Sequence, residues 1–204
     1  MEFDNKRAMK QLKELERLGT DKRLAADGWD KDWKCLIATL LSARTLDRTT
    51  IPIAEKLFEE FDSVEKLANA PEEEIGKMIN GVNFYLNKAR YVRALAEKLV
   101  KDYSGKVPHD FSKLIELPGV GRKTANVFLA EKGYDAVGVD THLSYCSQRL
   151  GWTKNTNPDK IEEDLKKLFP QSVWRNLNWI VVRFGQTYTN RIEKNKILDS
   201  LKRL

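Results

Sequence analysis

LPGVGRKTANV, residues 117–127, contains a glycine turn between two helical segments. Two glycines, Gly119 and Gly121, flank Val120, and a helical run begins directly afterwards near Arg122. A glycine turn that leads into a helix exposes backbone N–H groups with no side chain in the way, which suits a phosphate anion. Because glycine turns between helices are common, this turn alone predicts a helical hairpin and does not establish a function.

Helical periodicity extends on both sides of the turn. Apolar side chains recur at helical spacing in residues 33–41, 53–61, 89–103, 161–168 and 173–184. Helix-start signals lie between these segments, at Ser63, at Pro71 and at the pair Asn157-Pro158. No segment alternates as a strand does, so the sequence predicts an all-α protein of about ten helices.

The composition sets limits on the class of protein. Two cysteines, Cys35 and Cys146, and two histidines, His109 and His142, are too widely spaced for a metal cluster or a disulfide framework. A formal charge of +6 suits a polyanionic partner without proving one. The longest apolar run is far too short to span a membrane, and the N-terminus lacks a signal peptide. We therefore expect a monomeric, intracellular protein of the cytoplasm or nucleoid, with no membrane partner.

Four separate segments resemble one known family. Residues 117–127 resemble the helix-hairpin-helix of endonuclease III, and VDTH at 139–142 resembles the aspartate segment of that family at the expected separation. The resemblance continues through LLSAR at 40–44 with Asp47, and through Tyr85 with Lys88. It covers roughly residues 30 to 189. Two linked motifs make a coincidence improbable.

The resemblance implies a fold and a division into domains. The expected fold is all-α and two-lobed, with a helix-hairpin-helix and an interdomain active-site cleft. Residues 27–135 would form one helical domain with the hairpin at 117–121, and residues 1–26 would join 136–204 in a discontinuous second domain. A damaged base flipped out of double-stranded DNA would enter the cleft, because chemistry at C1′ of a stacked nucleotide is sterically blocked.

The resemblance also implies an activity, that of a bifunctional DNA glycosylase and AP lyase, with Lys123 as nucleophile and Asp140 as its catalytic partner. A lysine amine can displace a base at C1′, form a Schiff base and permit β-elimination. An ordinary lysine amine is protonated at neutral pH, so burial and neighbouring cations such as Arg122 must favour the neutral form. A nearby carboxylate favours the charged amine, so Asp140 is expected to stabilise charge or handle protons.

Further site residues follow from the same resemblance. It implies that Arg44, Phe84, Lys88, Gly119, Val120, Gly121, Arg122 and Thr124 contact DNA, and that Asp47, Thr141 and His142 support the pocket. Arg44 and Phe84 stand where relatives often have glutamine and leucine, at positions that fill the gap left by the flipped nucleotide. A ring can stack on bases and an arginine can bond to the orphaned base. Phe84 as a core residue is the alternative.

The expected cofactors differ from those of many relatives. Such relatives hold an iron–sulfur cluster on four cysteines near the C-terminus, and the first of these corresponds here to Thr189. Residues 190–204 contain no cysteine, so no cluster is expected, and their basic residues suggest a closing helix. The only cofactor left to expect is a monovalent cation at the hairpin.

Other interpretations remain open at this point. Lys123 as a surface lysine on a phosphate and Asp140 as a mere helix N-cap are the plain structural ones. A monofunctional glycosylase, in which Asp140 activates water and a mismatched or deaminated base leaves, is the first functional alternative. A non-catalytic DNA-binding hairpin protein is the second. Oxidised pyrimidines are the base class that the resemblance implies by default.

Overall fold

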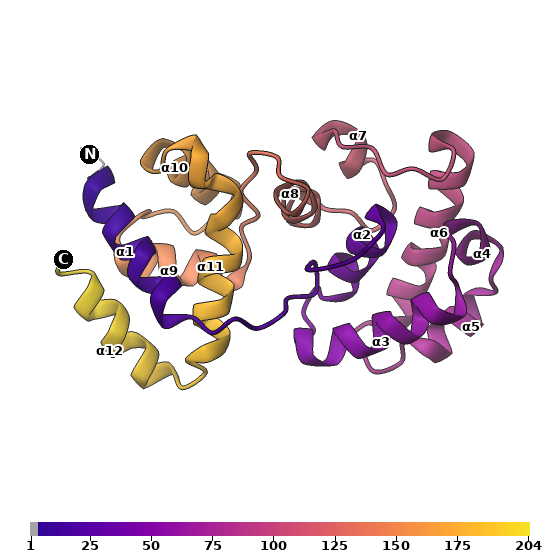
Figure 1. Ribbon diagram of the computed structural model, residues 1–204, viewed down its shortest axis with the longest axis horizontal. Coiled ribbons are helices and arrows are strands. Elements are labelled where there is room, and N and C mark those ends of the chain that lie inside the picture. Colours follow the sequence, from indigo (N-terminus) through magenta and orange to yellow (C-terminus); the bar gives the residue numbers. More distant parts are fainter. Residues whose placement is uncertain (1–3) are drawn as a thin grey trace. The chain divides into compact units, whose positions relative to one another are not determined.

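The computed structural model describes residues 4–204, which fold as helices joined by loops (Figure 1). Within these residues there are twelve α-helices, one short 3-10 turn and no strand, so the all-α prediction is confirmed. None of the helices found there is both long and apolar enough to cross a membrane.

The chain divides into two compact units. The hairpin unit is Arg23–Phe128, and the discontinuous unit combines the N-terminal segment up to Lys22 with Leu129–Leu204. Both boundaries lie closer to the N-terminus than the sequence predicted. At the first boundary, Ala25 and Ala26 are buried in the hairpin unit, where their carbonyls accept from Trp29 Nε1 at 2.7 Å and from Cys35 Sγ at 3.4 Å.

The second boundary has an equally local cause. Gly133 and Asp135 bond to the discontinuous unit, since the Gly133 carbonyl accepts from Arg175 at 3.5 Å and the Asp135 carboxylate accepts from Gln171 at 2.7 Å. These two residues precede Val137, which is fully buried in the core of that unit. The boundary therefore falls inside a helix, α8, which spans Arg122–Glu131.

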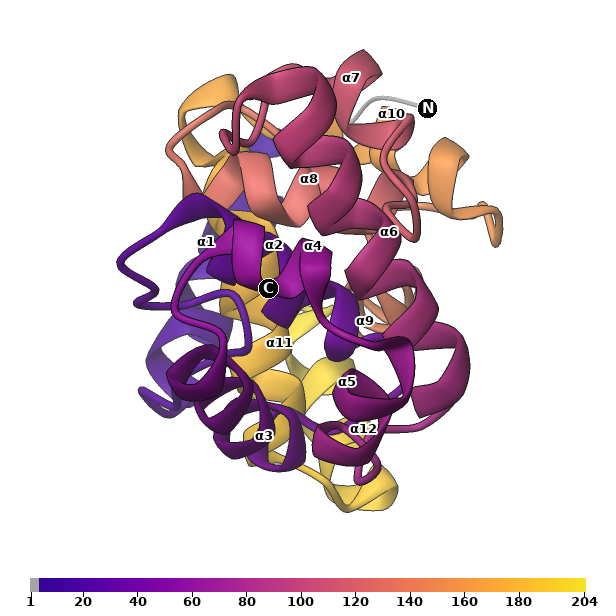
Figure 2. The same ribbon diagram turned by 90° about the vertical axis from the view of Figure 1, so that its right-hand side faces the viewer.

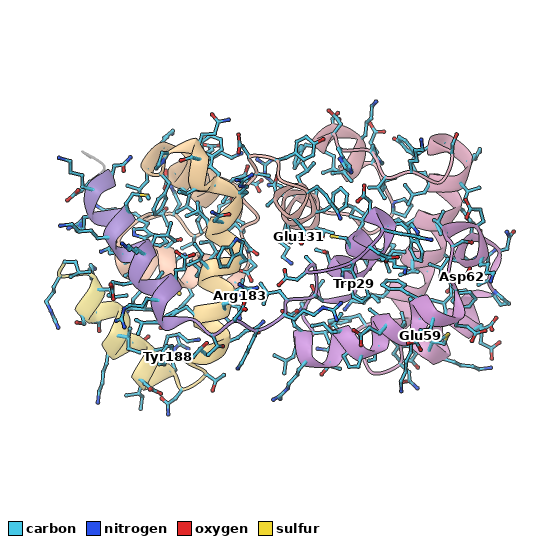
Figure 3. The ribbon with its side chains drawn as sticks, in the orientation of Figure 1. Trp29, Glu59, Asp62, Glu131, Arg183 and Tyr188 are labelled. Carbon is cyan, nitrogen blue, oxygen red and sulfur yellow. The ribbon has the colours of Figure 1, made fainter. Side chains whose placement is uncertain are left out.

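The hairpin unit is built around one buried helix. Its elements are α2 (Asp32–Leu41), α3 (Asp47–Glu60), α4 (Val64–Asn69), α5 (Glu72–Met78), α6 (Tyr85–Tyr103), α7 (Phe111–Ile115) and most of α8. Eight of the ten residues of α2 are buried, and α4 lies beside α6 (Figures 1 and 2). Trp29, which is labelled in Figure 3, belongs to this unit. Its ring packs edge-on against Phe58, with the ring centroids 5.0 Å apart. Ser63 caps α4, as the sequence predicted.

The discontinuous unit packs its first helix against its later ones. It contains α1 (Asn5–Leu18), α9 (Thr141–Leu150), α10 (Pro158–Leu168), the 3-10 turn η1 (Gln171–Val173), α11 (Trp174–Thr187) and α12 (Arg191–Leu201). Helix α1 packs on α11, and α12 packs on α9. Arg183 of α11, labelled in Figure 3, contacts the end of the N-terminal segment. It forms an ion pair with Asp21 at 3.0 Å and donates a hydrogen bond to the Lys22 carbonyl. Asn157 caps α10 with proline next, as predicted.

Candidate active site

The hairpin between α7 and α8 depends on Gly119. This residue has a φ of +75°, in the left-handed region that favours glycine. A Cβ placed on it would lie 2.7 Å from Cβ of Tyr91 and 2.8 Å from Cδ1 of Leu40, closer than real side chains approach. The turn is closed by the Val120 N–H, which donates to the Leu117 carbonyl at 3.1 Å. Gly119 therefore seats the hairpin on α6 and α2, and no other residue fits there.

Gly121 has the opposite surroundings. A Cβ placed on it would meet no heavy atom within 4 Å. Within the described part of the chain, the N–H groups of Gly119 and Gly121 donate to no protein acceptor. Backbone N–H groups without a protein acceptor beside a helix N-terminus can bind an anion such as a phosphate. The phosphate site that the sequence suggested for this turn stays a prediction.

The residues after the turn differ in exposure. Arg122 opens α8 with its guanidinium 5.1 Å from the centroid of the Phe111 ring. Lys123 follows at the second position of α8 and is half-buried. The side chains of Val120 and Thr124 are buried, so any contact that these two make with DNA has to come from the backbone.

Asp140 lies in the discontinuous unit, at the N-terminus of α9. Its Oδ1 accepts from the Leu143 N–H at 2.8 Å, which confirms it as the N-cap. Among residues 4–204 no hydrogen bond is donated to its other carboxylate oxygen, Oδ2. One oxygen therefore orients the carboxylate while the other is available for chemistry. Lys123 belongs to the hairpin unit, so each residue is positioned by the helix of its own unit.

The two residues after Asp140 have different surroundings. Thr141 is exposed, whereas the His142 imidazole lies so close to Gly185 of α11 that any side chain there would overlap it. Lys194 of α12 donates to the Gly185 carbonyl at 2.9 Å. His142 thus supports the helix that carries Asp140. Sequence reasoning missed Gly185 and Lys194; the only signal was a glycine inside a helical pattern.

Both cysteines of the chain are buried. Cys146 is buried, as the sequence predicted from its neighbours, and burial raises the pKa of its thiol to about 12. Cys35 is also buried, in the other unit. In the described residues no group of three His, Cys, Asp or Glu side chains is arranged to hold a metal ion.

Arg44 and Phe84 form a stacked pair on the surface of the hairpin unit. The guanidinium carbon of Arg44 lies 5.1 Å from the centroid of the Phe84 ring, and the Phe84 side chain is 56% exposed. Both residues have positive φ, 56° and 60°, which non-glycine residues rarely adopt. The alternative that Phe84 belongs to the core is therefore wrong. The sequence did not predict that these two side chains contact each other.

Lys88, for which the sequence predicted a contact with DNA, is buried inside the hairpin unit. Only 6% of it is exposed, and its Nζ donates to the carbonyls of Leu41 and Ala43, both at 2.7 Å, and to Thr45 Oγ1 at 3.2 Å. Burial lowers the pKa of this amine to about 8. A lysine has three N–H donors, and all three are used inside the protein, so the expected direct contact with DNA is corrected. Asp47, the first residue of α3, lies just beyond this loop.

Comparison with known proteins gives a family for this fold and site. The HhH-GPD model, described as a superfamily of base excision DNA repair proteins, matches residues 37–171. Endonuclease III of Thermotoga maritima is 41% identical over 156 residues, which are 76% of this chain and 73% of that protein. Endonuclease III of Bacillus subtilis is 33% identical over 158 residues, with 76% and 71% covered.

Solved structures agree with the sequence relatives. A trapped endonuclease III–DNA covalent intermediate aligns with a TM-score of 0.83 at 32% identity, over 89% of this chain and 86% of that one. A thermostable thymine-DNA glycosylase aligns with a TM-score of 0.77 at 23% identity, over 89% and 87%, and shares the fold. The chain belongs to the HhH-GPD superfamily of base excision DNA repair proteins, as a homologue of endonuclease III.

Proposed function

We propose that Lys123 is the nucleophile through which this base excision repair glycosylase and AP lyase acts on DNA. The observation that carries the proposal is the position of Lys123, the second residue of α8, directly after the open hairpin turn. A DNA phosphate held by the Gly119 and Gly121 N–H groups brings the backbone, and with it a sugar, to the amine. A solved relative was trapped as a covalent intermediate with DNA, which supports a covalent step.

The proposed reaction follows from amine chemistry. The neutral amine of Lys123 attacks C1′, and the base leaves with the electron pair of the glycosidic bond and takes up a proton. The amine then loses a proton and the sugar ring opens, which gives an imine. Loss of a C2′ proton and departure of the 3′ phosphate cleave the strand. Asp140 stabilises the positive charge that develops on the sugar or receives the proton, through the carboxylate oxygen that its N-cap bond leaves available.

The proposed substrate is double-stranded DNA with an oxidised pyrimidine or an abasic site. Lys123 belongs to the hairpin unit and Asp140 to the discontinuous unit. We propose that the protein works as a monomer in the compartment that holds the DNA, the cytoplasm or nucleoid. The test is a panel of duplexes with one lesion each, in which base release and strand nicking are measured separately. Release without nicking would favour the monofunctional alternative, and binding without release would favour a binding module.

Arg44 and Phe84 are proposed to fill the gap that the flipped nucleotide leaves. They are exposed side by side, and an arginine with an aromatic ring can both bond to and stack on an unpaired base. We expect Arg44→Ala combined with Phe84→Ala to slow excision on the order of 10- to 100-fold and to weaken opposite-base preference. The measurement is single-turnover excision with each of the four bases opposite the lesion. Unchanged rates and preference would contradict this role.

We also propose that this protein holds no iron–sulfur cluster. The sequence has two cysteines, both buried and in different units, so four thiolate ligands cannot be assembled. The segment after Thr189 forms α12, which packs on α9 and is joined to it by an ion pair between Arg149 and Asp199 at 2.5 Å. Purified protein is expected to be colourless, with less than stoichiometric iron by elemental assay. One cluster's worth of iron per chain would contradict the proposal.

We also propose that a monovalent cation binds at the hairpin, where it takes no part in the chemical reaction. The carbonyls of Leu117 and Gly121 already accept the N–H groups of Val120 and Ala125, at 3.1 and 3.0 Å. A cation would share these oxygens, since each carbonyl has two lone pairs. Its contribution would be to hold the turn that binds phosphate.

A further inference from the structure

Hydrogen bonds join two loops of the hairpin unit, and these loops carry Arg44 and Phe84. The first joins α2 to α3 and contains Arg44, and the second leads into α6 and contains Phe84. Asn83 of the second loop donates through Nδ2 to the Arg44 carbonyl and through its N–H to Thr45 Oγ1 at 3.0 Å. The positive φ of both Arg44 and Phe84 means that neither conformation is favoured locally, so contacts elsewhere have to maintain them.

Lys88 supplies the largest set of such contacts. Its three acceptors, the Leu41 and Ala43 carbonyls and Thr45 Oγ1, begin at the last residue of α2 and lie on both sides of Arg44. The ammonium lies at the C-terminal end of α2, where carbonyls lack helical partners and a cation is favoured. The Lys88 residue itself lies in the first turn of α6, the helix that begins directly after Phe84. One side chain thus joins the loop of Arg44 to the helix that Phe84 opens.

We propose that Lys88 is a positioning residue, whose three hydrogen bonds hold Arg44 and Phe84 in the paired arrangement that enters the DNA gap. This inference rests on the proposed role of those two residues. Lys88 touches neither the reacting sugar nor the DNA in this assignment and acts through the loop alone. A displacement of about 1 Å at a site can cost on the order of 10²-fold in rate, so the expected effect is large enough to measure.

The test is Lys88→Met, which keeps most of the apolar length of the side chain and removes its donors. We expect single-turnover base excision to fall about 10- to 100-fold and opposite-base preference to weaken. The matched control is Thr39→Val. The Thr39 hydroxyl is buried in α2 and donates to the Cys35 carbonyl at 2.7 Å, a bond that lies within α2 and includes neither loop. The Thr39→Val variant should have a lower melting temperature and an excision rate within about threefold of wild type.

A mutant cycle separates positioning from a general loss of stability. In a chain that carries Arg44→Ala and Phe84→Ala, no pair remains to be positioned, so adding Lys88→Met should lower excision by less than about threefold. An equal loss in both backgrounds would overturn the inference. If Arg44→Ala with Phe84→Ala has no effect in the first place, the proposed role of that pair fails instead, and the two failures are thereby distinguished.

A milder variant covers the case in which Lys88→Met does not fold. Thr45→Val removes the hydroxyl that accepts both from Lys88 and from the Asn83 N–H, while the lysine itself is kept. Its loss of excision should be smaller, and it too should depend on Arg44 and Phe84. A fluorescent adenine analogue opposite the lesion provides a second readout, since a misplaced pair should reduce the unstacking signal on binding. An unchanged signal in both variants would contradict the inference.

Discussion

Lys123→Gln is expected to abolish covalent trapping of the protein on DNA. Borohydride present during the reaction reduces an imine to a stable amine, so the wild-type protein should yield a protein–DNA adduct with damaged or abasic duplex. Glutamine has nearly the length of lysine and a similar helix propensity, so α8 should remain folded. Strand nicking should fall on the order of 10³-fold or more, because the glutamine amide cannot form the imine.

The control for this prediction carries the same substitution on the same hairpin. Lys113 is exposed on α7, and Lys113→Gln removes one positive charge close to the turn without touching the proposed nucleophile. Trapping should persist there, and DNA binding by Lys123→Gln should largely survive. An adduct of undiminished yield in Lys123→Gln would reassign the nucleophile. Wild-type protein that releases a base but neither traps nor nicks would support the monofunctional alternative.

What the sequence predicts correctly here depends mainly on local chemistry. The cap at Asp140, the start of α8 at Arg122 and the caps at Ser63 and Asn157 follow from residues within one helical turn. Motif spacing adds the family and the hairpin, and the closing helix α12 follows from the composition of residues 190–204. These features need no knowledge of which distant segments meet.

The features that sequence reasoning missed depend on long-range packing. Lys88 lies 45 residues from Ala43, whose carbonyl it binds, and nothing in the pattern near position 88 predicts that bond. The contact between His142 and Gly185 joins α9 to α11 in the same way. Phe84 lies next to Tyr85, and its ring is exposed at the start of α6, where its φ is positive. In each case the tertiary structure decides whether a side chain is exposed or is held inside the protein.

Asp140→Asn is expected to separate the two roles of this residue. Asparagine caps helices about as well as aspartate, so the bond to the Leu143 N–H should persist and the melting temperature should change little. The charge is lost, however, and base release should slow on the order of 10²- to 10³-fold. Cleavage of a preformed abasic site should slow less, by about tenfold or below, because no base has to depart and less positive charge develops on the sugar.

Asp140→Ala provides the contrast that tests this interpretation. Alanine removes both the charge and the cap, which costs about 1 kcal/mol at a typical N-cap and lowers the melting temperature by about 2–4 °C in a protein of this size. If Asp140 acts in catalysis, Asn and Ala should impair base release similarly while only Ala lowers stability. If Asp140 were no more than the N-cap of α9, the Asp140→Asn variant would release bases at the wild-type rate. Only the Asp140→Ala variant would then show slower base release or lower stability. Base-release rates and melting curves of the two variants therefore distinguish a catalytic carboxylate from a structural one.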